Sequence, residues 1–171
     1  MDSQLTHDST FDGSIARVLV VADWGVDAQA VIDACERRSH DRPASFALVV
    51  PAWLHGIDWT GDPRGSAPCA RKQLADVIGL ATTAGRHFDS AAVGDPDPVA
   101  AMYDALADWP ADEIILCTRR RPAGIPHPFD LNHRTRRVTG LPVHRMAVPS
   151  SSGRPRRRRA GHCGLAQPQA A

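Results

Sequence analysis

Short runs of apolar residues alternate along this chain with segments in which apolar residues recur every three or four positions. The runs show no polar alternation, which is typical of strands buried on both faces. Helices between such strands make a parallel sheet with helices on both sides the simplest arrangement. The pattern therefore predicts an α/β fold, a Rossmann-like doubly wound sheet of five parallel strands.

The expected strands and helices follow one another in strict alternation. The strands cover residues 17–22, 45–51, 90–93, 113–118 and 143–148. The first helix is capped by Asp27, the second runs from Pro68 to Gly85, and the last covers 129–139. The third helix ends at Trp109, and its expected buried stripe is Val99, Met102, Tyr103 and Leu106. Asp95 and Asp97 precede that helix among prolines, so we interpret them as caps and not as a catalytic pair.

Composition divides the 171 residues into one domain and two extensions. We expect an α/β domain over residues 16–149, a disordered segment at 1–15 and a disordered tail at 150–171 that carries five arginines and no acid. The tail could attract nucleic acid non-specifically, but no nucleic-acid-binding motif accompanies it, so we expect it to be dispensable. Four dispersed cysteines without a CxxC pair, and no apolar stretch of about 20 residues, indicate a cytoplasmic protein with reduced thiols and no membrane contact.

Candidate ligand-binding residues lie beyond the carboxyl ends of the strands, where open α/β sheets bind their ligands. Asp23 and Trp24 follow the first strand, Val50 lies near the end of the second, Gly94 follows the third, and Arg119, Arg120 and Arg121 follow the fourth; Asp130 lies in the first turn of the last helix. The arginines have two interpretations. Their guanidinium groups could capture an anion, or they form a solvated charge run with one arginine paired to Asp23. We favour the second, because position alone does not show that side chains converge on a ligand.

The sequence assigns no catalytic residue and no metal site. A P-loop, a GxGxxG fingerprint, a nucleophile elbow and the HxGH and SGGxDS motifs of related nucleotide enzymes are all missing. His55, His127, His133 and His144 are scattered without metal-ligand spacing, and are expected on the surface or in loops. The question of an enzyme stays open, with a non-enzymatic role favoured.

Three segments resemble the universal stress protein family. They are Val18 to Asp23, with its terminal acid; Val93-Gly94-Asp95-Pro96 with the Ala-rich helix and the strand from Ala111 to Leu116; and Leu141-Pro142-Val143. The likeness spans about residues 16–149. It implies the adenine nucleotide alpha hydrolase-like strand order 3-2-1-4-5, a homodimer through the last strand and, in many members, an ATP site. It also implies that Asp23 lies beside the nucleoside, whereas a purely structural role would have Asp23 end the strand and cap the next turn.

The chain departs from the family at the phosphate-binding motif. ATP-binding members carry G-x2-G-x9-G-(S/T) after the fourth strand, because glycines let backbone N–H groups approach phosphates. This chain has Thr118 to Gly124 there, and Phe129-Asp130 at the place of the terminal pair. The sequence therefore predicts a binding or regulatory domain with a degenerate nucleotide pocket, which needs no cofactor and for which ATP or AMP is a doubtful ligand. The alternatives are a functional adenine-nucleotide or phosphate binder that uses Asp23 and the Arg119–Arg121 loop, and an interaction protein that acts through its basic tail.

Overall fold

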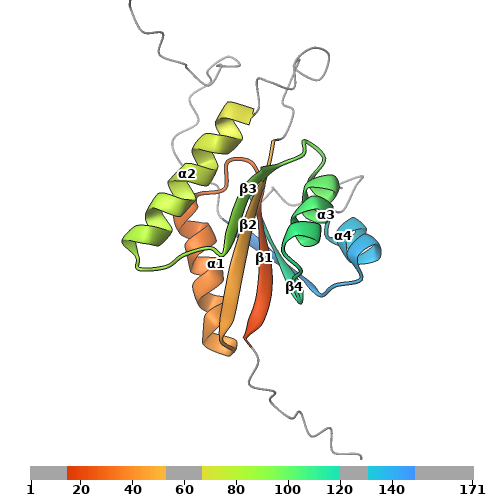
Figure 1. Cartoon of the computed structure of the whole chain (residues 1–171), viewed down its shortest axis with the longest axis horizontal. Coiled ribbons are helices and arrows are strands. Elements are labelled where there is room, and N and C mark those ends of the chain that lie inside the picture. The colour runs from red at the N-terminus through yellow and green to blue at the C-terminus, as the bar shows by residue number, and fades with distance from the viewer. Residues whose placement is uncertain (1–14, 53–66, 120–130, 149–171) are drawn as a thin grey trace, which may run out of the picture.

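The computed structural model describes residues 15–52, 67–119 and 131–148. Their strands form one parallel sheet in the order β3-β2-β1-β4-β5 (Figure 1). The strands are β1 Ala16–Ala22, β2 Ala44–Pro51, β3 Ser90–Gly94, β4 Glu113–Arg119 and β5 Val143–Val148. The prediction of five parallel strands and the strand order implied by the resemblance are both confirmed.

Helices cover both faces of this sheet. They are α1 Ala28–Asp41, α2 Ala67–Thr83, α3 Pro98–Asp108 and α4 Leu131–Thr139. In Figure 1, α1 and α2 lie on one side of the sheet, and α3 and α4 lie on the other. The doubly wound architecture is therefore confirmed. The expected start of the last helix at residues 129 and 130 lies outside the described residues, as do the predicted segments 1–15 and 150–171 apart from Ile15.

The alternation of side chains along each strand divides the core into two layers. Val18 and Val20 of β1 pack in the layer under α1 and α2, whereas Leu19 and Val21 pack under α3 and α4. The same alternation along β4 sends Cys117 to the first layer and Leu116 to the second. The layers matter for function, because they decide on which face of the sheet the residues at the strand ends project.

The start of α3 follows the predicted capping chemistry. The Asp97 carboxylate accepts a hydrogen bond from the backbone N–H of Val99 at 2.9 Å, and Pro98 is the first helical residue. Asp95 in turn accepts a bond from the N–H of Asp97 at 2.7 Å. The two acids therefore serve the helix terminus, as expected.

The prediction that Tyr103 belongs to the buried stripe of α3 is wrong. Val99 and Met102 are buried, but Tyr103 is 52% exposed. The helix packs on a narrower stripe in which Met102 fills the space over the sheet, so Tyr103 lies at its outer edge. Its hydroxyl donates to the carbonyl oxygen of Val138 in α4 at 3.1 Å.

A charged cluster joins three elements at the amino end of β4. Glu113 is buried there, and its carboxylate lies 2.6 Å from Arg38 Nε of α1 and 3.3 Å from His144 Nε2 of β5. A buried carboxylate needs such partners, because water no longer solvates it. The cluster fixes the C-terminal part of α1 against the sheet, at the opposite end of the strands from the carboxyl ends where ligands bind.

None of the helices in the described ranges is long and apolar enough to cross a lipid bilayer.

Candidate functional site

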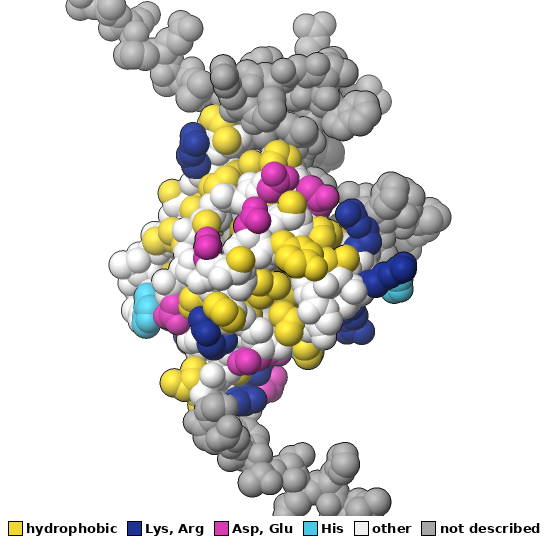
Figure 2. All heavy atoms as spheres, turned by 45° about the vertical axis from the view of Figure 1, so that its right-hand side comes forward, with side chains coloured by type: hydrophobic (Ala, Val, Ile, Leu, Met, Phe, Trp, Pro, Cys, Tyr) yellow, Lys and Arg dark blue, Asp and Glu magenta, His cyan; other side chains and the backbone are white. Residues whose placement is uncertain are grey.

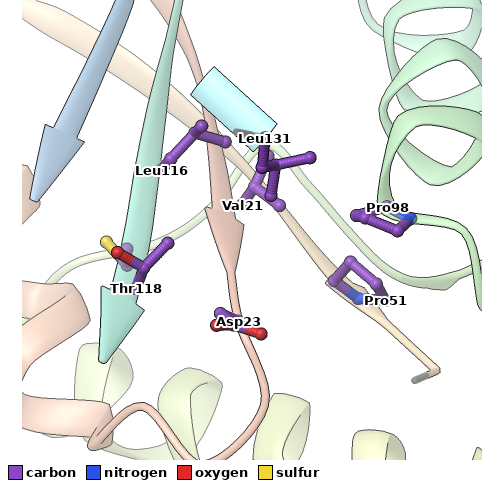
Figure 3. A pocket seen from close by; sticks show the side chains of 8 residues that line it. Val21, Asp23, Pro51, Pro98, Leu116, Thr118 and Leu131 are labelled. Carbon is purple, nitrogen blue, oxygen red and sulfur yellow. The ribbon is translucent and has the colours of Figure 1, made fainter. Parts of the chain in front are cut away.

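A shallow hollow lies between the carboxyl ends of β1 and β4, on the side of α3 and α4 (Figure 3). Its volume is about 180 Å³, including space open to solvent. Eight described residues line it: Val21, Asp23, Pro51, Pro98, Leu116, Cys117, Thr118 and Leu131. The hollow therefore lies at the switch point where doubly wound sheets bind ligands, as the strand order predicts.

The lining of the hollow is apolar except at Asp23 and Thr118. Val21 and Leu116 form its floor, and Leu131, the first residue of α4, closes one side. Small-molecule pockets usually measure about 300–1,000 Å³ and bury most of their ligand. The hollow in the described part of the chain encloses no space of that size, and Asp23 supplies its one acidic side chain.

The turn after β1 is held by its own side chains and by α2. The Asp23 carboxylate accepts a hydrogen bond from the N–H of Trp24 at 2.8 Å, and the Asp23 carbonyl accepts one from Val26 at 3.2 Å. Gln73 of α2 donates to the Asp23 carbonyl at 2.9 Å and accepts from the N–H of Gly25 at 3.2 Å. Asp23 therefore ends the strand and stabilises the turn that follows, as the structural role predicts, and it also lines the hollow.

Arg119 projects to the opposite face of the sheet from Asp23. Its guanidinium group lies 4.7 Å from the centre of the Trp24 ring, which is a cation–π stack. Gly25 has a φ of +67°, and a β-carbon there would lie 3.6 Å from the same guanidinium. Arg119 forms no ion pair within the described residues. The side chains of Trp24 and Arg119 therefore stack on each other at the strand ends, on the other face of the sheet, and do not line the hollow.

The remaining candidate residues are dispersed. Val50 is buried in the layer under α1 and α2, on the far side of the sheet from the hollow. Gly94 faces α3, where an added β-carbon would lie 2.5 Å from the Ala101 β-carbon. Both residues serve packing in this structure. Arg120, Arg121 and Asp130 lie outside the described residues.

Two polar residues were missed in the sequence, Thr118 in the lining of the hollow and Arg145 beside Thr118. Thr118 lines the hollow, and its hydroxyl accepts a hydrogen bond from Arg145 Nε of β5 at 3.1 Å. Arg145 is exposed and has no ion pair in the described part of the chain. The strand alternation from the buried Val143 places Arg145 on the α3–α4 face, and this signal was available in the sequence.

The described residues hold no metal cluster, and two of their cysteines are unsuited to thiol chemistry. They contain no group of three or more His, Cys, Asp or Glu side chains arranged to hold a metal ion. Burial raises the pKa of the Cys117 thiol to about 12, and burial likewise raises the pKa of Cys35 to about 12. Both are therefore neutral thiols near pH 7 and poor nucleophiles.

No protein-family model and no curated protein matches the chain. Solved structures with a similar fold do match it. A universal stress protein family member from Burkholderia pseudomallei aligns with a TM-score of 0.52 at 18% identity, over 77% of this chain and 96% of that one. A universal stress protein solved in complex with cAMP aligns with a TM-score of 0.53 at 16% identity, over 81% of this chain and all of that one. With the strand order and the hollow between β1 and β4, these alignments show that the chain has the fold of the universal stress proteins.

Proposed function

We propose that this protein is a universal-stress-protein-like binding or regulatory domain of the cytoplasm, without catalytic activity and with a degenerate nucleotide pocket. The observation that carries the proposal is the chemistry of the hollow between β1 and β4. Its lining is apolar apart from Asp23 and Thr118, and its charged group in the described part is the Asp23 carboxylate.

In the turn after β1, the backbone N–H groups that could bind a phosphate already donate to other groups. The N–H groups of Trp24, Gly25 and Val26 donate to Asp23 Oδ1, Gln73 and the Asp23 carbonyl. Phosphate sites in related folds use unpaired backbone N–H groups at a helix start. Here Asp23 would in addition repel the anion. These features support a role in which no cofactor is required and ATP or AMP binds weakly or not at all.

Thermal unfolding with and without nucleotide tests the proposal. We expect no shift of the unfolding midpoint with millimolar ATP, AMP or cAMP, because a ligand stabilises a protein negligibly when its concentration lies far below its dissociation constant. A universal stress protein that binds cAMP serves as the positive control. A saturable shift with any adenine nucleotide, confirmed by calorimetry, would contradict the degenerate pocket.

The second candidate function is nucleotide or phosphate binding, and the relative solved with cAMP favours it. In this alternative a small nucleotide binds beside Asp23, and the Arg119–Arg121 segment holds its phosphate, which would require the Arg119 side chain to leave Trp24 on the other face of the sheet. Arg145 beside Thr118 is a further cation on the hollow's face of the sheet. If a shift is observed, Arg145→Ala and Arg119→Ala distinguish the two faces, since only a residue that contacts the ligand weakens the shift.

We also propose a homodimer contact along the outer edge of β5, which is an end strand of the sheet. An end strand offers backbone groups for pairing with another copy. Sedimentation at micromolar protein concentration measures the association. A monomer throughout that range would contradict this contact.

A further inference from the structure

The outer face of α3 and α4 carries an exposed apolar patch. Tyr103 of α3 is 52% exposed and Val138 of α4 is 40% exposed. The Tyr103 hydroxyl donates a hydrogen bond of 3.1 Å to the backbone carbonyl oxygen of Val138, so the two exposed residues meet where α3 and α4 adjoin. The other large exposed apolar side chains of the described residues, Ile15, Trp24 and Ile78, lie on separate elements. Patches of this kind mark contact surfaces more often than single exposed residues do.

Charge is segregated across this patch. The α3 helix exposes Asp104 and Asp108 and contains no lysine or arginine. The α4 helix exposes His133, Arg134, Arg136 and Arg137 and contains no acid. Figure 2 shows acidic side chains on one side of an apolar area and basic side chains on the other. Within the described residues, Asp104, Asp108 and Arg137 take part in no ion pair.

This distribution is self-complementary under a two-fold rotation. A two-fold contact places the same patch of both copies face to face, so each residue meets a different one on the other copy. An axis between Tyr103 and Val138 sets the acidic α3 of one copy against the basic α4 of the other, twice. Tyrosine at the centre of such a contact is a typical anchor, and the surrounding opposite charges select the partner.

We propose that the α3–α4 face binds a second copy of this chain in this two-fold arrangement. This surface is separate from the hollow between β1 and β4 and from the edge of β5. Copies that already pair along β5 can therefore associate further through the α3–α4 face. The charges also make the contact sensitive to salt, because the attraction between exposed charges decays over a distance of about 8 Å at physiological ionic strength and over shorter distances at higher salt.

Two charge-reversed variants, measured alone and mixed, test the proposal. The acidic side is reversed in Asp104→Lys/Asp108→Lys, and the basic side in His133→Glu/Arg137→Glu. Each variant alone sets like charges against each other across the axis, so sedimentation should show the loss of one level of association. The equimolar mixture sets opposite charges together at both contacts, and should recover the assembly of the original chain.

Further variants separate the anchor from the charges. Tyr103→Ala should raise the dissociation constant about tenfold or more, whereas Tyr103→Phe keeps the ring and should leave it within a factor of about three. Arg71→Glu, on the exposed surface of α2 across the sheet, is the matched control and should change nothing. The proposal is overturned if the original chain is monomeric, or if the charge-reversed variants and their mixture all sediment like the original chain.

Discussion

Gly94 lies at the end of β3, where a side chain would collide with α3. An added β-carbon would come within 2.5 Å of the Ala101 β-carbon and 2.9 Å of Val49 Cγ2, and neither neighbour can rotate away easily. The glycine is thus needed for helix packing beside the sheet, and a ligand is not required to explain it. This is a case in which a residue singled out by its position after a strand has a sufficient structural role.

Replacing Gly94 by alanine should therefore destabilise the protein. We expect Gly94→Ala to lower the free energy of unfolding by about 1–3 kcal/mol, as overpacked sites do. Urea denaturation measures the change. Gly79→Ala is the control, because the β-carbon at this exposed position of α2 meets nothing within 4 Å. Alanine there should stabilise the helix by up to about 1 kcal/mol. Equal effects of the two substitutions would contradict the packing argument.

The two buried thiols should be inert in the folded protein. Burial raises the pKa of Cys35 and Cys117 from 9.0 to about 12, so the reactive thiolate is scarce at pH 8. In a Cys69→Ser/Cys163→Ser variant, we expect no measurable reaction with a disulfide reagent until denaturant is added, when two thiols react. Rapid reaction of the folded variant would show that one of the two sites opens.

The same thiols should make stability depend on alkaline pH. Their folded pKa is higher than the unfolded one, so their contribution is complete below pH 9.0 and is lost as the pH rises toward about 12. Each thiol should cost about 1 kcal/mol of unfolding free energy per pH unit in that window. Urea denaturation at several pH values measures this, and Cys117→Ala should flatten the dependence. An identical slope in that variant would exclude the thiol as its source.

At the scale of the elements, Glu113 links α1, β4 and β5. Its carboxylate lies 2.6 Å from Arg38 Nε, and both side chains are less than one fifth exposed. A double-mutant cycle with Glu113→Gln and Arg38→Met should give a coupling of about 2 kcal/mol in urea denaturation, because each single change leaves a largely buried charge without its partner. Additivity within about 0.5 kcal/mol would show that the pair contributes no more than an exposed one.

The strands and helices could be predicted from the sequence because their patterns are local. Each strand begins and ends within one residue of its expected bounds, and the Asp97 cap and its proline neighbour are a signal contained in a few residues. Tyr103 was misplaced because helical spacing defines a face but not its width. The width of the buried face depends on how closely the helix packs on the sheet. At Gly94 the α3 helix lies so close that an added β-carbon would come within 2.5 Å of the Ala101 β-carbon.

The side-chain contacts between elements could not be predicted from such local patterns. The β4 run is apolar on both faces, so its pattern does not show which face Arg119 takes; only the register with β1 does. Arg38 pairs with Glu113 across 75 positions, and Arg145 with Thr118 across 27. Such contacts depend on the strand order, which the resemblance implied and the apolar pattern alone does not give.

At the scale of the whole molecule, the described core is built from residues between Ala16 and Val148. A chain shortened to residues 15–149 should therefore keep the unfolding midpoint of the full chain. It should also elute earlier from heparin at low salt, because the five arginines of 150–171 are gone. Circular dichroism and a salt gradient measure the two effects. A lower midpoint would place part of the stability in the extensions, and unchanged elution would dismiss the basic tail as a binding segment.

The stack of Arg119 on Trp24 also provides an optical reporter at the carboxyl edge of the sheet. The indole is 39% exposed and lies against a guanidinium group that has no carboxylate partner in the described part of the chain. Any anion that draws Arg119 away changes the surroundings of the ring. Ligand screening by tryptophan fluorescence then needs no label, and a Trp24→Phe variant identifies how much of the signal comes from this edge.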